Sequence, residues 1–238
     1  MVRNDSMTII AHRGSPAPGA KENTVKSFQR AAALGADMME TDIRRTKDGQ
    51  LVCAHYRSWR GKAIQHMSYS EWRAMTQKRE GWTPALLQDL LPMFHEGYTF
   101  NLELKEKGLE KQVLSEIPDY TNLLFSSFDE KIIQYIKQIE PSCQTALLIG
   151  RFDLSQERRR PFQWWRDYFP ERRLKEAKAD IVCPHFRLAG RCFIERMHQK
   201  GYKVYVWTVN HPGRLKKLKT YGADGVFTDN VGEAERMI

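Results

Sequence analysis

The sequence predicts an α/β protein: a (β/α)8 TIM barrel with a β-hairpin arm and a short insertion after the second strand. Short apolar runs alternate with helix-length amphipathic stretches along almost the whole chain, a pattern typical of βαβ units around a parallel sheet. An Asp-Gly turn separates two of the runs, and charged residues follow the ends of several others. The length of 238 residues is close to the roughly 250 residues that such a barrel needs.

The apolar runs are expected to be strands and the amphipathic stretches helices, because of the periods at which their apolar residues recur. The nine expected strands are residues 8–11, 38–43, 51–54, 100–104, 123–126, 145–149, 181–183, 203–209 and 225–228. Most are separated by expected helices, at residues 25–34, 86–95, 109–117, 130–139, 193–200 and 213–220. One strand is too many for an eight-stranded barrel.

The turn at Asp48-Gly49 accounts for the extra strand. Asp-Gly between two extended runs is a strong signal for a tight turn, and no crossover helix fits between residues 43 and 51. The two runs are therefore expected to form an antiparallel hairpin. Its second arm returns to the barrel near His55, and eight parallel strands remain to close the barrel.

Two segments depart from the alternation. Residues 56–83 are polar and aromatic, with a weak helical stretch at 70–77, and are expected to cross the barrel mouth beside the second strand. Residues 151–173 carry seven arginines and the adjacent Trp164 and Trp165, and are expected to form a long excursion after the fifth barrel strand. No repeat or linker divides the sequence, so residues 1–238 are expected to form a single domain.

Composition limits the classes of function. A formal charge of +9 would attract phosphates, nucleic acid or an anionic membrane surface. No run approaches the roughly 20 apolar residues of a membrane span, and no signal-peptide core precedes the first strand. The cysteines form no CxxC pair and lie in or beside apolar segments: Cys53, Cys143, Cys183 and Cys192. They are expected to be buried free thiols of a basic, cytoplasmic, enzyme-sized protein.

Acidic side chains recur at the ends of the expected strands, where barrels of this type carry their active sites. Glu40 and Asp42 are two residues apart, as are Glu103 and Lys105. Since side chains alternate faces along a strand, each pair is expected to point into the barrel mouth. Three converging carboxylates would need a cation, and oxygen ligands favour Mg²⁺ or Ca²⁺. The alternative is a set of rim salt bridges, which is less expected at successive strand ends than for one pair.

Two histidines complete the expected site. His12 and His55 would supply the acid and the base of an in-line displacement at phosphorus. Arg13 and Lys105 would hold phosphate oxygens. The set predicts a metal-dependent phosphodiesterase. Whether His185 lines the site stays open, and the remaining four histidines are expected in the core or on the surface: His66, His95, His198 and His211.

Three further residues lie near this set. Asn23 precedes an expected helix and is interpreted as its N-cap. Glu22 is expected on the loop over the mouth, where it could bond His12, Arg13 or substrate. Trp207 is expected either to wall an apolar part of the pocket or to pack in the core.

The same residues lie in motifs that span nearly the whole chain. In order they are Ala11-His12-Arg13-Gly14, Glu22-Asn23-Thr24, Gly35-Ala36-Asp37, Glu40-Thr41-Asp42-Ile43, Thr46-Lys47-Asp48-Gly49, Leu51-Val52 before His55, Asn101-Leu102-Glu103-Leu104-Lys105, Ser127-Phe128-Asp129, Val206-Trp207-Thr208-Val209-Asn210, Gly222-Ala223-Asp224-Gly225 and Thr228-Asp229. In these motifs the sequence resembles the glycerophosphodiester phosphodiesterase family.

The resemblance implies hydrolysis of a glycerophosphodiester, such as glycerophosphocholine, to sn-glycerol 3-phosphate and an alcohol, in glycerol and lipid metabolism. By that analogy Glu40, Asp42 and Glu103 hold one divalent cation, and His12 and His55 are the acid and base pair. A neighbouring glycerol hydroxyl would attack phosphorus first, giving a cyclic phosphate that water then opens.

The sequence departs from the family pattern near the second histidine. Tyr56 stands where the family usually has Asp, and Arg57-Ser58-Trp59-Arg60 replaces a common Arg-Thr-Thr run. Lys21 replaces a usual proline. These departures leave the identity of the substrate open.

Two rival functions are weighed against this one. A lysophospholipase D, or a cyclising phosphodiesterase on a lipid, would use residues 151–173 as a lipid-facing lip, although a solvated helical cover is the favoured reading of that segment. A nucleic-acid-binding module is motivated by charge alone, and no motif supports it. The expected partner is therefore a small phosphodiester, with no nucleic acid and no transmembrane segment; peripheral membrane contact and oligomeric state stay open.

Overall fold

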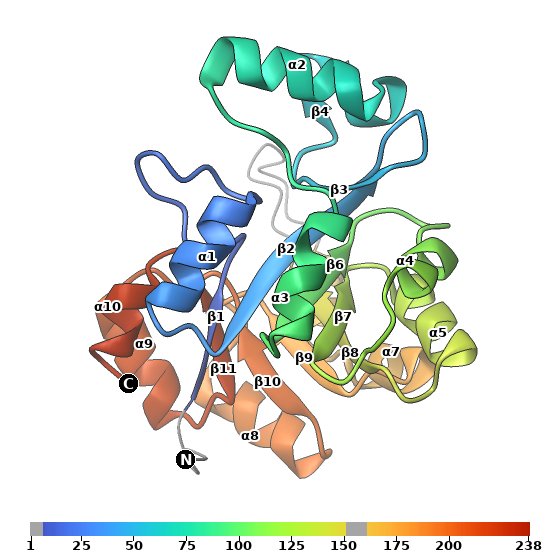
Figure 1. The fold of residues 1–238 in the computed structure, drawn as a ribbon. Coiled ribbons are helices and arrows are strands. Elements are labelled where there is room, and N and C mark those ends of the chain that lie inside the picture. Colours follow the sequence, from blue (N-terminus) through green and yellow to red (C-terminus); the bar gives the residue numbers. More distant parts are fainter. Residues whose placement is uncertain (1–6, 151–160) are drawn as a thin grey trace.

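The computed structural model describes residues 7–150 and 161–238, with a closed parallel β-barrel at its centre (Figure 1). Neighbouring strands pair in the order β1-β11-β10-β9-β8-β7-β6-β2, and β1 pairs with β2 to close the ring. In chain order the barrel strands are β1 Thr8–Ala11, β2 Met38–Arg45, β6 Phe100–Leu104, β7 Leu123–Ser127, β8 Gln144–Ile149, β9 Ile181–Pro184, β10 Lys203–Val206 and β11 Gly225–Thr228. The predicted barrel is confirmed.

The hairpin arm is confirmed as well. Strand β3, Leu51–Cys53, pairs antiparallel with the end of β2, with Ile43 opposite Cys53. The connection turns at Gly49, whose φ of 84° lies in the left-handed region that glycine adopts without steric cost. This arm carries the chain out of the barrel and places His55 directly after β3.

Helices cover the outside of the barrel (Figure 1). They are α1 Val25–Ala33, α3 Leu91–His95, α4 Glu110–Glu116, α5 Glu130–Ile139, α7 Glu171–Ala177, α8 Arg191–Gln199, α9 Pro212–Thr220 and α10 Val231–Glu235. Helix α6, Pro161–Tyr168, precedes α7 in the predicted excursion. Residues 151–160 of that excursion lie outside the described residues.

Two predicted elements differ in detail. The helix expected at 86–95 is a 3-10 turn, Gln88–Leu90, followed by the short α3, because Leu86 instead forms a β-bridge with Val52. The strand expected at 203–209 ends at Val206, since only an isolated bridge from Trp207 to His185 continues it. Helices α7 and α10 were not predicted.

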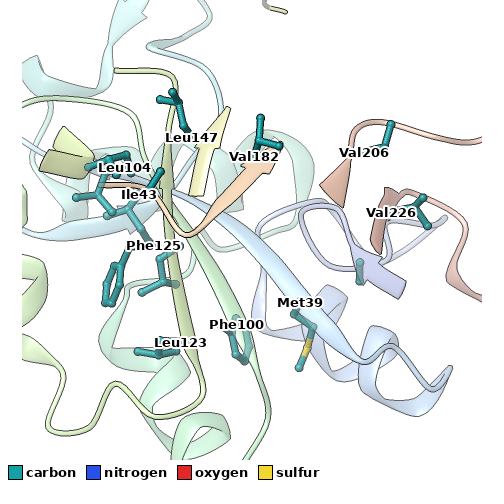
Figure 2. Close-up of a cluster of buried hydrophobic side chains, with 14 of the residues drawn as sticks. Met39, Ile43, Phe100, Leu104, Leu123, Phe125, Leu147, Val182, Val206 and Val226 are labelled. Atoms are coloured by element: carbon teal, nitrogen blue, oxygen red, sulfur yellow. The ribbon is translucent and has the colours of Figure 1, made fainter. Parts of the chain in front are cut away.

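The alternation of side chains divides the core into two layers. The outer layer lies between strands and helices; Figure 2 shows members such as Met39, Ile43 and Phe100. The inner layer fills the barrel and comprises Ile10, Met38, Leu124, Ala146, Leu148, Ile181, Cys183, Tyr205 and Phe227. Because Met38 belongs to the inner layer, Glu40 and Asp42, with the same parity, also point inward. The fold thus places the β2 carboxylates inside the barrel.

The insertion after β3 forms a small unit of its own. It contains β4 Ser58–Trp59, β5 Lys62–Ala63, the 3-10 turn Ile64–His66 and helix α2 Tyr69–Glu80. A capping box between Ser68 and Glu71 begins α2, and Gly81 in the left-handed region ends it, so the helix is longer than the predicted 70–77. Trp72, Ile64 and Met67 form a core beneath it, separate from the barrel core.

The four cysteines are free, but only three are buried. Cys192 is exposed, so the prediction was wrong for it; it precedes the buried Phe193 and Ile194 on α8 and points away from the barrel. Among the helices of the described residues, none combines the length and the apolar character needed to cross a membrane.

Candidate active site

A cavity of about 820 Å³ opens at the carboxyl ends of the barrel strands. Its wall includes His12 after β1, Glu40 on β2, His55 after β3, Glu103 and Lys105 from β6, and Trp207 after β10. This is the end of a (β/α)8 barrel at which active sites lie.

Three buried carboxylates converge beside this cavity. Glu40 and Asp42 come from β2 and Glu103 from β6, and the strand register sets Asp42 opposite Glu103. One oxygen of each lies within 4.8 Å of the others. Oε1 of Glu40 is buried and has no hydrogen-bond partner among the described residues. An unpartnered buried oxygen in an all-oxygen cluster fits a divalent cation.

Burial and mutual repulsion perturb the three carboxyl groups. Burial, reinforced by the charge of Asp42, raises the pKa of Glu40 to about 8. Burial also raises the pKa of Glu103. Burial opposes ionisation of Asp42, but Lys105 and Arg13 outweigh it and lower the pKa of Asp42. Within this cluster, Asp42 is therefore the most readily ionised carboxyl.

Two basic side chains contact the cluster. Lys105 Nζ lies 2.6 Å from Oδ1 of Asp42 and 2.5 Å from Oε1 of Glu103. Arg13 Nε lies 3.5 Å from Oδ2 of Asp42, an ion pair that is too long for a good hydrogen bond. Arg13 Nη1 donates to Glu22 at 3.2 Å. The salt bridges that the sequence left open as an alternative thus coexist with the geometry of a cation site.

Asn23 is not the N-cap of α1. Thr24 caps that helix, accepting from Ser27 N. Asn23 has a φ of 56°, a conformation that Asn tolerates better than most residues, and its Nδ2 donates to Oδ2 of Asp42 at 2.9 Å. Its Oδ1 accepts from Thr41 Oγ1 at 2.8 Å. Asn23 therefore fixes the orientation of the Asp42 carboxylate.

His12 is held by the carboxylate of Asp229, a motif residue to which no role was assigned from the sequence. Its Nδ1 lies 2.7 Å from Oδ1 of Asp229. Asn210 holds Asp229 in turn, donating from Nδ2 at 2.5 Å and accepting from Asp229 N at 2.9 Å. Burial lowers the pKa of His12, but Asp229 and the charge of Glu40 raise it above its usual value. Asp229 follows β11 with the parity of the inward-pointing Phe227, so the strand-end rule would have found it.

His55 has a different environment. Its ring Nδ1 is buried and has no hydrogen-bond partner among the described residues, and burial lowers the pKa of His55 to about 3. Its backbone carbonyl accepts from Arg44 Nε and Nη2, at 3.2 and 2.9 Å. Arg44 also pairs with Glu106 at 2.5 Å. Arg44, missed in the sequence, is two residues beyond Asp42 and ties the arm to the barrel.

The other predicted residues lie on the cavity wall. Trp207 lines the cavity and also packs against the inner core layer, and its Nε1 donates to Cys183 O at 2.8 Å. His185 also lines the cavity, and burial lowers its pKa to about 4. Asn101 was missed: it pairs with Glu40 in the strand register, and neither of its amide atoms has a partner among the described residues.

Gly14 fixes the loop that presents His12 and Arg13, and Gly14→Ala is expected to lower the free energy of unfolding by about 2–4 kcal/mol. A Cβ at this residue, whose φ is +80°, would lie 2.4 Å from Oγ of Ser27. Gly49 is the matched control, with φ +84° and no atom within 4 Å of an added Cβ, so Gly49→Ala should cost only about 1 kcal/mol. Urea unfolding measures both, and equal losses would show that the Ser27 contact is relieved without cost.

Comparisons with known proteins show what the chain is similar to. The model of the glycerophosphoryl diester phosphodiesterase family matches residues 12–233. A glycerophosphodiester phosphodiesterase from Bacillus altitudinis is 26% identical, over 93% of this chain and 94% of its own. A lysophospholipase D from Mus musculus is 25% identical, over 92% and 82%. An Oleispira antarctica phosphodiesterase, solved in complex with the product sn-glycerol-3-phosphate, has a TM-score of 0.80 at 24% identity and covers 97% and 96% of the two chains.

Proposed function

The chain belongs to the glycerophosphoryl diester phosphodiesterase family, and we propose that it hydrolyses a glycerophosphodiester to sn-glycerol 3-phosphate and an alcohol. The observation that carries the proposal is the buried cluster of Glu40, Asp42 and Glu103 beside the cavity that His12 and His55 line. The test is hydrolysis of glycerophosphodiesters with and without added divalent cations. Release of glycerol 3-phosphate is expected only with a cation present.

The three carboxylates would hold one divalent cation, which we propose to be Mg²⁺ or Ca²⁺ because all their ligand atoms are oxygens. A cation bound there would offset charge on the phosphate and polarise a phosphoryl oxygen. Arg13 and Lys105 bring N–H donors to the same place and are proposed to bind nonbridging oxygens. Glu22 holds the Arg13 guanidinium, and Trp207 walls the substrate cavity.

His12 and His55 divide the proton transfers in this proposal. His55, whose pKa burial lowers to about 3, is neutral at pH 7 and accepts the proton of the attacking hydroxyl or water. His12, whose Nδ1 is occupied by Asp229, presents Nε2 and donates a proton to the leaving alkoxide as its P–O bond breaks. If the neighbouring glycerol hydroxyl attacks first, water opens the resulting cyclic phosphate with the two roles reversed.

Asp229 is proposed as the positioning residue of His12. Asp229→Asn is expected to move the high-pH limb of the pH profile of kcat to lower pH and to reduce kcat about 10- to 1,000-fold. Burial lowers the pKa of His12 while Asp229 raises it, so loss of the carboxylate lowers that pKa and the protonated acid disappears at lower pH. NMR titration of His12 measures the same shift directly.

Asp224→Asn is the matched control, because Asp224 accepts from His198 Nε2 at 2.8 Å, just before β11 begins. It should leave the pH profile unchanged. An Asp229→Asn enzyme with an unmoved high-pH limb would exclude Asp229 as the partner that keeps His12 protonated.

One observation favours a second candidate, a lysophospholipase D. Trp164, Trp165 and Phe169 are exposed at α6, with Trp165 stacked on Phe169 at 5.3 Å, and Arg166 between them lines the active-site cavity. Exposed aromatic side chains beside a positively charged arginine suit contact with a lipid surface. Rates on glycerophosphocholine and lysophosphatidylcholine separate the two functions. Turnover of the acylated substrate alone would establish the second.

We further propose that residues 1–238 act as one domain in the cytoplasm, on a small diester and not on nucleic acid. The four free cysteines support a reducing compartment. The insertion supports a single functional unit, because His55, between β3 and the first strand of the insertion, lines the barrel cavity.

A further inference from the structure

His55 lies where the chain leaves the barrel sheet. Strand β3 pairs with β2 as far as Cys53, and one further backbone bond joins Ala54 N to Asp42 O at 2.7 Å. His55 comes next and lines the active-site cavity. Its ring Nδ1 has no hydrogen-bond partner among the described residues. No bond from that nitrogen fixes the ring, so the position of the ring depends on the backbone of His55 and on packing.

Arg44 holds that backbone. Its Nε and Nη2 both donate to the His55 carbonyl oxygen, at 3.2 and 2.9 Å. Because the guanidinium is planar, the two donors fix the direction of the carbonyl as well as its distance. The third nitrogen of Arg44, Nη1, is paired with Oε1 of Glu106 at 2.5 Å. Glu106 lies two residues beyond the end of β6, so β2 and β6 together set the place at which the His55 backbone is held.

The contacts of Arg44 distinguish it from a ligand of the substrate phosphate. Arg44 lines the active-site cavity, yet its side chain is only 7% exposed and each of its three guanidinium nitrogens contacts an oxygen of the chain. Glu106 also balances its charge. Arg13, which is proposed to bind the phosphate, differs because its Nε has no hydrogen-bond partner among the described residues. These contacts favour a role for Arg44 toward the protein and not toward the substrate.

The aromatic neighbour of His55 restrains its ring only loosely. The ring centres of His55 and Tyr56 are 4.7 Å apart in an edge-to-face arrangement. Tyr56 is itself 64% exposed, so this neighbour is not held in place by a core. The bonds from Arg44 to the carbonyl are therefore the firmer restraint on His55.

We propose that Arg44 is a positioning residue for His55 and that it acts on the reaction only through the backbone of this base. The guanidinium fixes the plane of the carbonyl, which restricts the direction in which the His55 side chain leaves the backbone and hence the place that its ring reaches. A misplacement of about 1 Å can lower a rate by about 100-fold. The inference rests on the proposed function, since it concerns the base of that reaction.

The first experiment measures kcat, KM and cation binding of Arg44→Lys, with glycerophosphocholine and glycerophosphoethanolamine as substrates. Lysine keeps the charge but cannot donate two bonds in one plane, so kcat is expected to fall about 10- to 100-fold while KM and the cation affinity stay the same. Arg45→Lys is the matched control, because Arg45 is the next residue, is exposed, and donates to Gly108 O at 3.4 Å. It should leave kcat unchanged.

An unchanged kcat in Arg44→Lys, or a raised KM with kcat kept, would overturn the inference and leave the proposed function standing. Hydrolysis of neither diester by the unmodified enzyme would overturn both.

The second experiment separates positioning from a general effect on folding. Arg44→Lys is introduced into the His55→Ala variant, and the residual kcat of that variant is measured with and without it. The two values should be equal, because a residue that acts only through His55 has no ring left to position. A fall by the same factor as in the unmodified background would mean that Arg44 acts on the fold or on the substrate, and the inference would be wrong.

Discussion

Glu40→Gln is expected to abolish binding of the divalent cation and to lower kcat/KM at least about 1,000-fold. Glutamine has the shape of glutamate, and its amide oxygen can still accept from Arg13 N, which donates to Glu40 at 2.8 Å. The substitution therefore preserves the loop that carries His12. It removes one negative charge and a ligand oxygen from the cluster.

The same substitution should leave the cation-free protein as stable as before. Burial and the neighbouring Asp42 both disfavour a charge on Glu40, and they raise its pKa to about 8. A neutral side chain at that position relieves the repulsion. Loss of activity together with unfolding would therefore contradict the prediction.

Calorimetric titration with Mg²⁺ and with Ca²⁺ measures the binding, and the rise of Tm on adding cation measures it independently. Glu110→Gln is the matched control. Glu110 is also buried, but its carboxylate accepts from Gly108 N at 2.8 Å, in the first turn of α4. The Glu110→Gln variant should bind the divalent cation as the unmodified protein does. Unchanged binding in Glu40→Gln would mean that the cluster is only an ion-pair network with Lys105.

His12→Ala and His55→Ala are each expected to lower kcat by about 100- to 10,000-fold, the range of general acid or base catalysis. Cation binding should persist in both, because neither ring belongs to the three-carboxylate cluster. His198→Ala is the control, since His198 also pairs with an aspartate but lies on α8, outside the cavity. A variant lacking both active-site histidines that still turned over at the normal rate would refute the assignment.

The alternation of side chains along a strand was sufficient to predict, from the sequence, that the carboxylates lie close together. Because Glu40 and Asp42 are two residues apart, they had to lie on the same face of their strand, which predicted the cluster at the barrel mouth. The Asp48-Gly49 turn showed that the extra strand belongs to a hairpin, which left eight strands for the barrel. Parity is a property of the local backbone, and a sequence displays it directly.

Residues that act through the tertiary fold were harder to predict. Asn23 was interpreted as the helix cap because it precedes the helix, but the neighbouring Thr24 has the same capping chemistry, and a sequence does not show that Asn23 has a positive φ of 56°. Arg44 reaches the His55 carbonyl only because the hairpin folds back. Helix α2 could have been given its full length, because Ser68 and Glu71 have the spacing of a capping box.

The barrel and the segment that begins with β3 supply different residues of the cavity, and this separation affects how the enzyme can diverge. The barrel strands and the residues that follow them supply the carboxylates, His12 and the basic residues, whereas the segment from β3 to the end of α2 supplies His55 and, in a smaller pocket that His55 also lines, Trp59 and Trp72. That segment has its own small core and is tied to the barrel by the pairing of β3 with β2 and by the bonds from Arg44 to His55. Substitutions there can change the surroundings of His55 while the carboxylate cluster on the barrel strands is kept. The departures at Tyr56 and Arg57 lie in this segment, beside His55.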